Sequence, residues 1–487
     1  MSQQTTSHEN AQNSYSDHYQ GYAGLPTLVG LHTMSEAKVK GLPVHEAVSR
    51  LKRLHWAMKR LHGIFVARIA STPIYELKMA FSLHAHYCAE HVTSIAVRIR
   101  EMREPPYGLD EAPNAALDLF FDEVNSSPDL ESLLIGVYEY AVPHICIGFN
   151  SLLSDTNKLF DHPTYRVARF ASVEFEDIDQ YGRRALECLL PAKKQEVLDA
   201  WRKYLGEIIA ASGAIGETSP KPAMELHRKY SLTPRPYDGA VRRDSRFIDP
   251  YNMGVNAEAM LFDTTIPPLP KVLMLYFKRL REIDVPEMMS SILSEVEGKP
   301  WGYYRDMTRQ LWDEARHAMM GELGFVSLGI DWTGIPFNIT WSNSLNTQLT
   351  PLERHAVLFT IEQGLMPKKN GKENEWEIAV ASTDKLSSLI QDYDWADEIL
   401  HARIGRDWLV PQLGSQAESL AFGNAAWSKI LVDWRRWKEE GLTEHRNWWP
   451  DIYRIACEHW EIEPDPALLA YNTTYENTRP DLKQIAG

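Results

Sequence analysis

The 487-residue chain contains little cysteine, and its four cysteines are widely spaced. Because no two of them form a Cys-x-x-Cys pair, the sequence argues against a disulfide scaffold and against a cysteine-rich metal site. Widely spaced thiols are typical of a reducing compartment, and the N-terminus lacks the basic-then-apolar pattern of a signal peptide. We therefore expect a cytoplasmic protein.

Basic residues are outnumbered by acidic ones, and long apolar runs are missing. The chain has 51 Lys and Arg residues and 66 Asp and Glu residues, which gives a net charge of −15. An acidic surface does not favour nucleic acid or anionic lipid, so we expect neither as a partner. No apolar run approaches the roughly 18–20 residues that cross a bilayer, and we expect no membrane span.

Several motifs of common enzyme classes are missing. The chain has no phosphate-binding Gly-x-x-x-x-Gly-Lys-Ser/Thr loop, no Gly-x-Ser-x-Gly elbow and no dinucleotide-binding glycine fingerprint after a strand. Strand-like alternation is rare, whereas apolar residues recur at helical spacing. The sequence thus predicts an all-α protein and lends no support to a hydrolase or a nicotinamide enzyme.

The length and the distribution of proline predict more than one domain. The helical pattern of residues 26–215 is compatible with a degenerate four-helix bundle, although periodicity alone does not establish one. The predicted segments are a disordered tail (1–25), an N-terminal helical domain (26–215), a Pro-rich connector (216–268), a second helical domain (269–415) and a C-terminal helical extension (416–487).

The second helical domain, 269–415, is expected to contain four helices. Thr350-Pro351-Leu352-Glu353 is a capping box with proline in the first turn, and it marks the start of the third helix. A charged insertion, 366–381, separates the third and fourth helices, and we expect it to be exposed and to act as a lid. The four predicted helices span about 270–297, 301–322, 351–364 and 384–408.

The most informative pattern is Asp-Glu-x-x-His, which occurs at Asp313–His317 and again at Asp397–His401. Of 17 histidines, only these two have glutamate three residues upstream. Residues i and i+3 share a helix face, so each motif directs a carboxylate and an imidazole to one point. Two such helices, with one more glutamate from each of two others, form a carboxylate-bridged two-metal site. The alternative is two ordinary amphipathic helices with exposed polar residues.

The two remaining carboxylates must come from the first and third helices. Glu282 precedes the turn near residue 299 by about as many residues as Glu314 follows it, which places the two at matching heights. Glu287 would lie about 7 Å lower at 1.5 Å per residue, so it is the reserve candidate. In the third helix Glu362 is preferred, because Glu353 belongs to the helix cap.

The resulting donor set suits a pair of divalent ions. Four carboxylates balance two such ions, and one imidazole for each metal is compatible with Fe(II) or Mn(II). We expect two Fe ions, with Mn as the alternative. Asp313 and Asp397 are candidates to accept the second ring N–H of a metal-bound histidine; the alternative is a solvated helix face. The predicted ligands are Glu282, Glu314, His317, Glu362, Glu398 and His401.

The segments WDEARHAMMGE, FTIEQGL and ADEILHARIGRDWL resemble an uncharacterised bacterial family of the ferritin-like superfamily. The resemblance covers about 270–410, and it implies a ferritin-like bundle with these ligands in the same order. Pro286 and the charged insertion depart from the family pattern, and the N-terminal domain lies outside the match.

These observations favour a di-iron oxidoreductase that activates O₂ and oxidises a small organic substrate. Electrons would come from an external donor, since no flavin or iron–sulfur motif is present. The alternatives are a ferroxidase or other non-catalytic metal protein, and a helical scaffold with accidental motifs. Whether the chain forms a homodimer is left open. A second metal site at His84, His86, Glu90 and His91 is a weaker hypothesis than simple helix packing.

Overall fold

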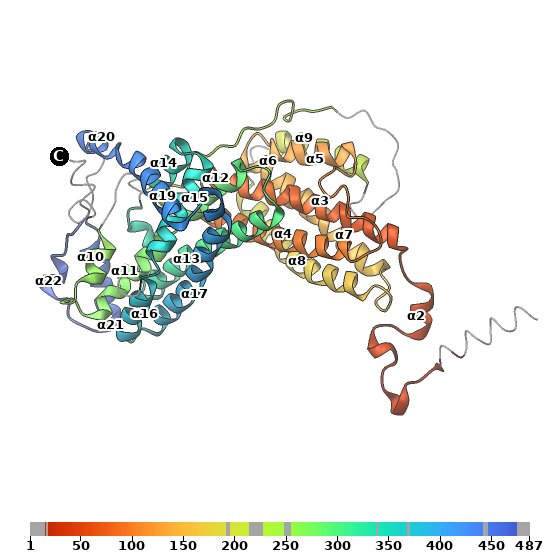
Figure 1. Ribbon diagram of the computed structural model, residues 1–487, viewed down its shortest axis with the longest axis horizontal. Coiled ribbons are helices and arrows are strands. Elements are labelled where there is room, and N and C mark those ends of the chain that lie inside the picture. Colours follow the sequence, from red (N-terminus) through yellow and green to blue (C-terminus); the bar gives the residue numbers. More distant parts are fainter. Residues whose placement is uncertain are drawn as a thin grey trace, which may run out of the picture. The chain divides into compact units, whose positions relative to one another are not determined.

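The computed structural model is helical throughout the residues that it describes. These are residue 15 and the ranges 18–190, 195–213, 227–247, 255–337, 339–367, 371–441 and 447–474. The only pairing of extended backbone within these ranges is one isolated bridge between Val255 and Thr474. The prediction of an all-α protein is therefore confirmed for the described part of the chain (Figure 1).

The chain divides into two compact units. The first contains residues 1–64 and 87–236, and the second contains residues 65–86 and 237–487. Helices α3 and α4 each contribute residues to both units. The elements before residue 213 are η1 (Tyr22–Gly24), η2 (Thr27–Gly30), α2 (Met34–Val39), α3 (Val44–Arg68), α4 (Tyr75–Arg100), α5 (Ala115–Asn125), α6 (Leu130–Leu134), the π-helical η3 (Ile135–Ala141), α7 (Val142–Asp155), α8 (His162–Leu189) and α9 (Gln195–Ser212).

The second unit contains the two motifs. Its elements after residue 237 are α10 (Ala257–Phe262), α11 (Pro268–Arg281), α12 (Asp284–Glu295), α13 (Trp301–Ser327), η5 (Trp332–Gly334), α14 (Thr340–Gln348), α15 (Pro351–Gly364), α16 (Lys372–Ala381), α17 (Lys385–Trp408), α18 (Val410–Leu413), α19 (Gln416–Leu431), α20 (Trp434–Glu439), α21 (Trp449–Trp460) and α22 (Pro466–Leu469).

Four helical segments of the second unit enclose a common interior. α12 packs against α13 and α15, and α17 packs against the same two helices. α11, which precedes α12 in the chain, also packs against α13. The approach of α11 to α13 requires Gly321, because a Cβ there would lie 2.2 Å from the backbone nitrogen of Leu280. This close packing carries the C-terminal end of α11 toward the motif face of α13.

The first predicted helix, 270–297, is interrupted, and this prediction of one continuous helix is wrong. α11 ends at Arg281, and α12 begins at Asp284. Pro286 has no N–H to donate to the carbonyl of Glu282, so the helical ladder is broken there. The N–H of Val285 bonds to that carbonyl instead, at 3.0 Å. Glu282 consequently lies at the break between two helices.

The predicted start of the third helix is confirmed. The Thr350 hydroxyl accepts from the N–H of Glu353, and the Glu353 carboxylate accepts from the N–H of Thr350. This reciprocal pair satisfies two backbone donors that a helix start leaves without partners. α17 likewise begins after Asp384, whose side chain accepts from the N–H of Ser387.

The charged insertion is not an exposed loop, and that prediction is wrong. Its described part forms α16, which packs against α11 and α17. Lys372 and Glu375 on this helix are both 1% exposed. Buried charges require partners, and both residues have them on neighbouring helices. Residues 368–370 of the insertion lie outside the described ranges.

The predicted tail and connector fall partly outside the described residues. Residues 1–14, 16 and 17 of the tail are not described, and the short helix η1 (Tyr22–Gly24) lies near its end. In the connector, residues 216–226 and 248–254 are not described, whereas 227–247 runs without helix. The domain boundaries otherwise stay predictions.

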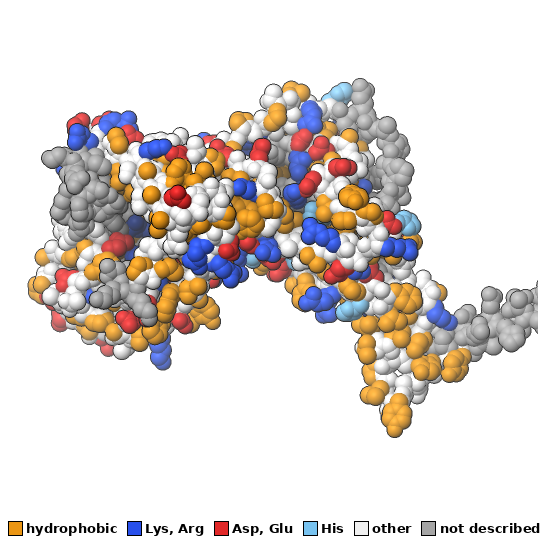
Figure 2. All heavy atoms as spheres, viewed as in Figure 1, with side chains coloured by type: hydrophobic (Ala, Val, Ile, Leu, Met, Phe, Trp, Pro, Cys, Tyr) orange, Lys and Arg blue, Asp and Glu red, His pale blue; other side chains and the backbone are white. Residues whose placement is uncertain are grey.

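One helical stretch, Leu130–Asp155, is long and apolar enough to cross a membrane, judged by length and composition alone. Of its most apolar window, 67% is buried inside the protein, as in an ordinary core helix, so this is weak evidence of a span. Figure 2 shows acidic and basic side chains intermixed over the visible face.

Candidate metal centre

The two motifs face each other because α13 packs against α17. Glu314 and His317 lie one turn apart on α13, and Glu398 and His401 lie one turn apart on α17. All four side chains are at most 2% exposed. The centroids of the two imidazole rings are 5.8 Å apart. The i, i+3 spacing therefore brings both pairs to one interior point.

Both imidazoles direct Nδ1 toward carboxylate oxygens. His317 Nδ1 lies 3.3 Å from Glu282 Oε2 and 3.5 Å from Glu314 Oε2. His401 Nδ1 lies 3.1 Å from Glu314 Oε1 and 3.4 Å from Glu398 Oε2. The two oxygens of Glu314 thus face different histidines. Glu314 could therefore contribute one oxygen on the side of each histidine.

All six predicted ligands lie in the same cluster, and it has two overlapping parts. The four potential donor atoms in each part lie within 4.8 Å of one another, and Glu398 is shared. We define the first position as Glu314, Glu362, Glu398 and His401, and the second position as Glu282, His317, Asp394 and Glu398.

Glu287, the reserve candidate, lies elsewhere. Its carboxylate is 2.8 Å from the Lys78 ammonium and 2.8 Å from the Arg243 guanidinium. All three side chains are at most 2% exposed. Glu287 therefore belongs to a separate buried ion-pair network.

The aspartates of the two motifs support the histidines in a crossed arrangement. Asp313 Oδ2 lies 3.4 Å from His401 Nε2, and Asp397 Oδ2 lies 3.3 Å from His317 Nε2. Arg316 donates to both aspartates, at 2.7 Å to Asp397. Asp313 is fully buried and Asp397 is 14% exposed, so neither lies on a solvated helix face. Each aspartate can fix the tautomer and orientation of the imidazole from the other motif.

Three charged residues of the centre were missed by the sequence analysis. Asp394 lies one turn before Glu398 on α17, and this i, i+4 spacing is a signal that could have identified it. The Lys372 ammonium donates to Asp394 at 2.9 and 3.0 Å and lies 2.9 Å from Glu398 Oε1. Arg279 donates to Asp394 and lies 2.9 Å from Glu282. No local sequence pattern separates these two cations from surface charges.

The electrostatics of the cluster differ between neighbouring carboxylates. Burial raises the pKa of Glu362 well above its usual range, and the nearby charges of Glu398 and Glu314 add to this effect. Burial by itself raises the pKa of Glu282, but the charges of Arg279 and Lys372 outweigh burial and lower this pKa to about 2. Burial and the neighbouring carboxylates thus favour the neutral form of Glu362, whereas Arg279 and Lys372 favour the ionised form of Glu282.

The histidines are affected by the same cluster. Burial by itself lowers the pKa of His317, but contacts with Asp397, Glu282 and Glu314 raise it to about 10. The pKa of His401 is raised well above its usual value by contacts that outweigh burial, chiefly those with Asp313 and Glu314. The carboxylates thus attract positive charge to both imidazoles, and a divalent ion can provide that charge in place of protons.

The unsatisfied atoms of the cluster fit a pair of divalent metal ions. Buried polar atoms normally have hydrogen-bond partners, and orphaned ones call for an explanation. Hard carboxylate oxygens with one imidazole nitrogen for each metal are the donors that suit Fe(II) and Mn(II). The buried atoms without a hydrogen-bond partner include Glu282 Oε2, His317 Nδ1, Glu362 Oε2, Glu398 Oε2 and His401 Nδ1.

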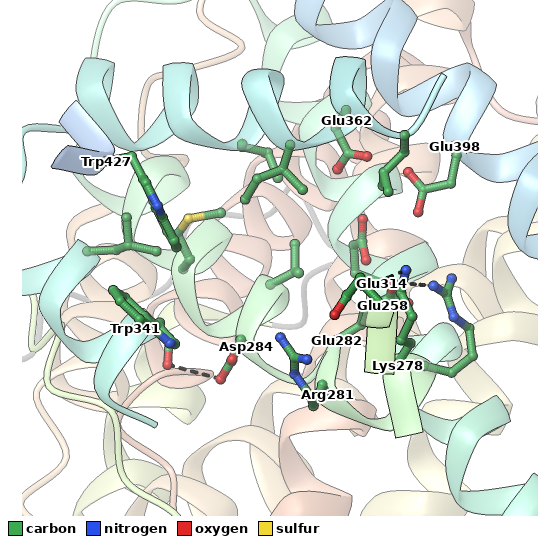
Figure 3. A pocket seen from close by; sticks show the side chains of 18 residues that line it. Glu258, Lys278, Arg281, Glu282, Asp284, Glu314, Trp341, Glu362, Glu398 and Trp427 are labelled. Atoms are coloured by element: carbon green, nitrogen blue, oxygen red, sulfur yellow. Dashed lines mark hydrogen bonds and ion pairs between the residues drawn. The ribbon is translucent and has the colours of Figure 1, made fainter. Parts of the chain in front are cut away.

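A pocket of about 230 Å³ opens onto the cluster. Figure 3 shows Glu314, Glu362 and Glu398 at one end and Trp341 with Trp427 at the other. The two indole rings stack with centroids 5.0 Å apart. All of the lining residues belong to the second unit. The apolar part of the wall is formed by Val285, Met288, Leu345, Leu358, Ile361 and Leu365.

The histidines of α4 do not form a second centre within the described residues. His84 packs against the ring of Phe65, with centroids 5.3 Å apart, and burial lowers its pKa to about 3. His91 Nε2 lies 2.6 Å from Glu174 in the first unit. Helix packing, the alternative interpretation, accounts for both residues.

Comparison of the chain with family models, with curated proteins and with solved structures gives no match. The resemblance to the ferritin-like superfamily therefore stays an expectation, and the functional argument rests on the geometry of the centre.

Proposed function

We propose that the chain is a di-metal carboxylate protein, with two iron ions bound in a ferritin-like bundle and manganese as the alternative metal. The proposal rests on one observation: buried oxygen and nitrogen atoms without hydrogen-bond partners converge on one point from α13, α15, α17 and the break between α11 and α12. The mutual packing of α12, α13, α15 and α17 supports the bundle. In this assignment Glu282, Glu314, His317, Glu362, Glu398 and His401 hold the metals, and Asp394 is an additional candidate.

The activity that best suits such a centre is O₂-dependent oxidation of a small organic molecule. A carboxylate-bound iron pair supplies two-electron redox chemistry with O₂. The surrounding residues supply orientation: Asp313 and Asp397 hold the imidazoles, and Gln310 donates to Glu362 Oε1 at 2.9 Å. Because the cluster is buried, water is largely excluded from the donors.

The pocket offers a place for a small organic substrate beside the cluster. Aliphatic and indole side chains form part of its wall, and Glu258, Arg281 and Asp284 add charged groups, so the pocket suits a molecule with both an apolar and a polar part. The pocket is small, so its substrate should have few non-hydrogen atoms. In this proposal electrons come from a separate donor, and the protein acts in the cytoplasm without nucleic acid or membrane.

Metal content and O₂ uptake test the proposal together. Protein made in iron-rich medium should contain nearly two metal ions per chain, and His317→Ala with His401→Ala should remove them. Candidate small molecules should then accelerate O₂ uptake by the Fe(II) protein and be recovered in oxidised form. A metal content near zero would refute the centre. If O₂ uptake produces only ferric mineral, the ferroxidase alternative is correct.

A further inference from the structure

The two positions of the centre differ in their contacts with lysine and arginine. We propose that the centre binds metal ions in order, tightly at the first position and weakly at the second, where an incoming ion competes with Lys372. The inference rests on the proposed metal binding and goes beyond it, because a symmetric pair of motifs by itself predicts two similar positions.

The first position is rich in available donors. Three of its buried atoms lack a hydrogen-bond partner: Glu362 Oε2, Glu398 Oε2 and His401 Nδ1. Within the described part of the chain, neither Glu314 nor Glu362 forms an ion pair with lysine or arginine. Clustered carboxylates without a cation repel one another, so a divalent ion relieves an existing unfavourable contact. Binding at this position should therefore be strong.

The second position already contains positive charge. The Lys372 ammonium lies 2.9 Å from Asp394 Oδ1, 3.0 Å from Asp394 Oδ2 and 2.9 Å from Glu398 Oε1. It also lies 3.6 Å from Glu282 Oε1, and Arg279 donates to Asp394. Its own residues contribute two atoms without hydrogen-bond partners, Glu282 Oε2 and His317 Nδ1, and the shared Glu398 Oε2 is a third. The two positions therefore differ in their contacts with cations rather than in the number of available donor atoms.

The shared residue Glu398 makes the competition specific. Its Oε2 faces His401 in the first position, whereas its Oε1 contacts Lys372. For Glu398 to bridge two metals, Oε1 must exchange the ammonium for the second ion. Lys372 is buried in the first turn of α16, which packs against α11 and α17, so the ammonium cannot simply turn toward solvent. The second ion must therefore displace or adjust a fixed positive charge.

Mn(II) titration of the metal-free protein tests the order of binding. Equilibrium dialysis measures the stoichiometry, and electron paramagnetic resonance distinguishes an isolated Mn(II) from a spin-coupled pair. For the natural chain we expect one tightly bound, isolated Mn(II) and a second ion with a Kd at least tenfold higher. Two ions of equal affinity that form a coupled pair from the first addition would overturn the proposal.

The variant Lys372→Met tests whether the Lys372 ammonium causes the weak binding of the second ion. Removing the ammonium should lower the Kd of the second ion at least tenfold and leave that of the first ion nearly unchanged. The matched control is Lys278→Met, which removes a lysine that is 12% exposed and pairs with Glu375 and Glu258 rather than with either position. An unchanged second Kd in folded Lys372→Met protein, or the same decrease in Lys278→Met protein, would overturn the role of Lys372.

Two further variants, which keep Lys372, test which position binds the first ion and which binds the second. Glu362→Gln should abolish the tight step, whereas Asp394→Asn should weaken only the second. The reverse assignment would overturn the proposed order. The absence of Mn(II) binding in the natural chain and in every variant would instead refute the proposed metal centre itself.

Discussion

Asp313 Oδ2 lies 3.4 Å from His401 Nε2, so the aspartate of the first motif supports the histidine of the second. Asp397 and His317 form the reciprocal pair at 3.3 Å. A carboxylate on the far ring nitrogen orients an imidazole and raises its basicity. Each motif thus supplies one ligand pair and the support for the other, which couples α13 and α17 through the centre.

This crossed arrangement predicts a loss of metal affinity without a loss of fold. Asp313→Asn or Asp397→Asn should weaken metal binding by roughly 10–100-fold, because the amide no longer fixes the charge and tautomer of the imidazole. Competition with a chelator of known affinity measures the change, and circular dichroism checks helicity. Asp392→Asn on the exposed face of α17 is the control. Unchanged affinity in both motif variants would contradict the assigned support.

A second prediction separates the two glutamates of the broken first helix. Glu282→Ala should abolish binding at the second position, because Glu282 lies 3.3 Å from His317. Glu287→Gln should keep its metal but lose stability, because it weakens the pairing of buried Lys78 and Arg243. Full removal by Glu287→Ala should cost about 3–5 kcal/mol.

Metal analysis and urea unfolding of the same protein preparations distinguish these outcomes. Loss of metal from folded Glu287→Gln protein, together with retention in Glu282→Ala protein, would reverse the assignment of the ligand.

The sequence predicted the parts of the centre that depend on local spacing. The i, i+3 separation within each motif and the capping box at Thr350 are properties of single helices, and such rules are local. The crossed pairing of Asp313 with His401 was not predictable, because it depends on the axial register between two helices.

The largest error concerned Lys372. A run of charges is usually a solvated face, and nothing in residues 366–381 reveals that their partners are buried carboxylates far along the chain. Asp394 is a different case, since its position one turn before Glu398 was visible. Whether two opposite charges on separate helices are buried together depends on tertiary packing, so it cannot be predicted from composition or periodicity.

The third prediction concerns acid sensitivity away from the metal centre. Burial lowers the pKa of His62 and His84 to about 3 and that of His355 to about 4. A histidine with a lowered folded-state pKa favours unfolding as pH falls below about 6.5, because only the unfolded chain takes up the proton readily. At pH 5 each of the first two should therefore cost about 2 kcal/mol relative to pH 8.

Urea unfolding of metal-free protein at pH 8 and pH 5 measures this loss. His62→Gln should reduce the difference between the two pH values by about 2 kcal/mol. His45→Gln, at an exposed position in the same helix, is the control. An identical pH dependence in the natural chain and the His62 variant would contradict the burial effect.

The last prediction tests whether the pocket is used by a substrate. Val285 is half-buried on α12 and lines the pocket near Glu282, so Val285→Trp should fill part of its volume of about 230 Å³. Metal content should stay near that of the natural chain, because Val285 is not a donor. Substrate-dependent O₂ uptake should fall at least tenfold, while iron oxidation without substrate should continue. Val432→Trp, at a position that is 69% exposed, controls for the added indole. If both variants oxidise the substrate at the rate of the natural chain, the substrate does not bind in this pocket. That result would leave the proposed metal centre unaffected.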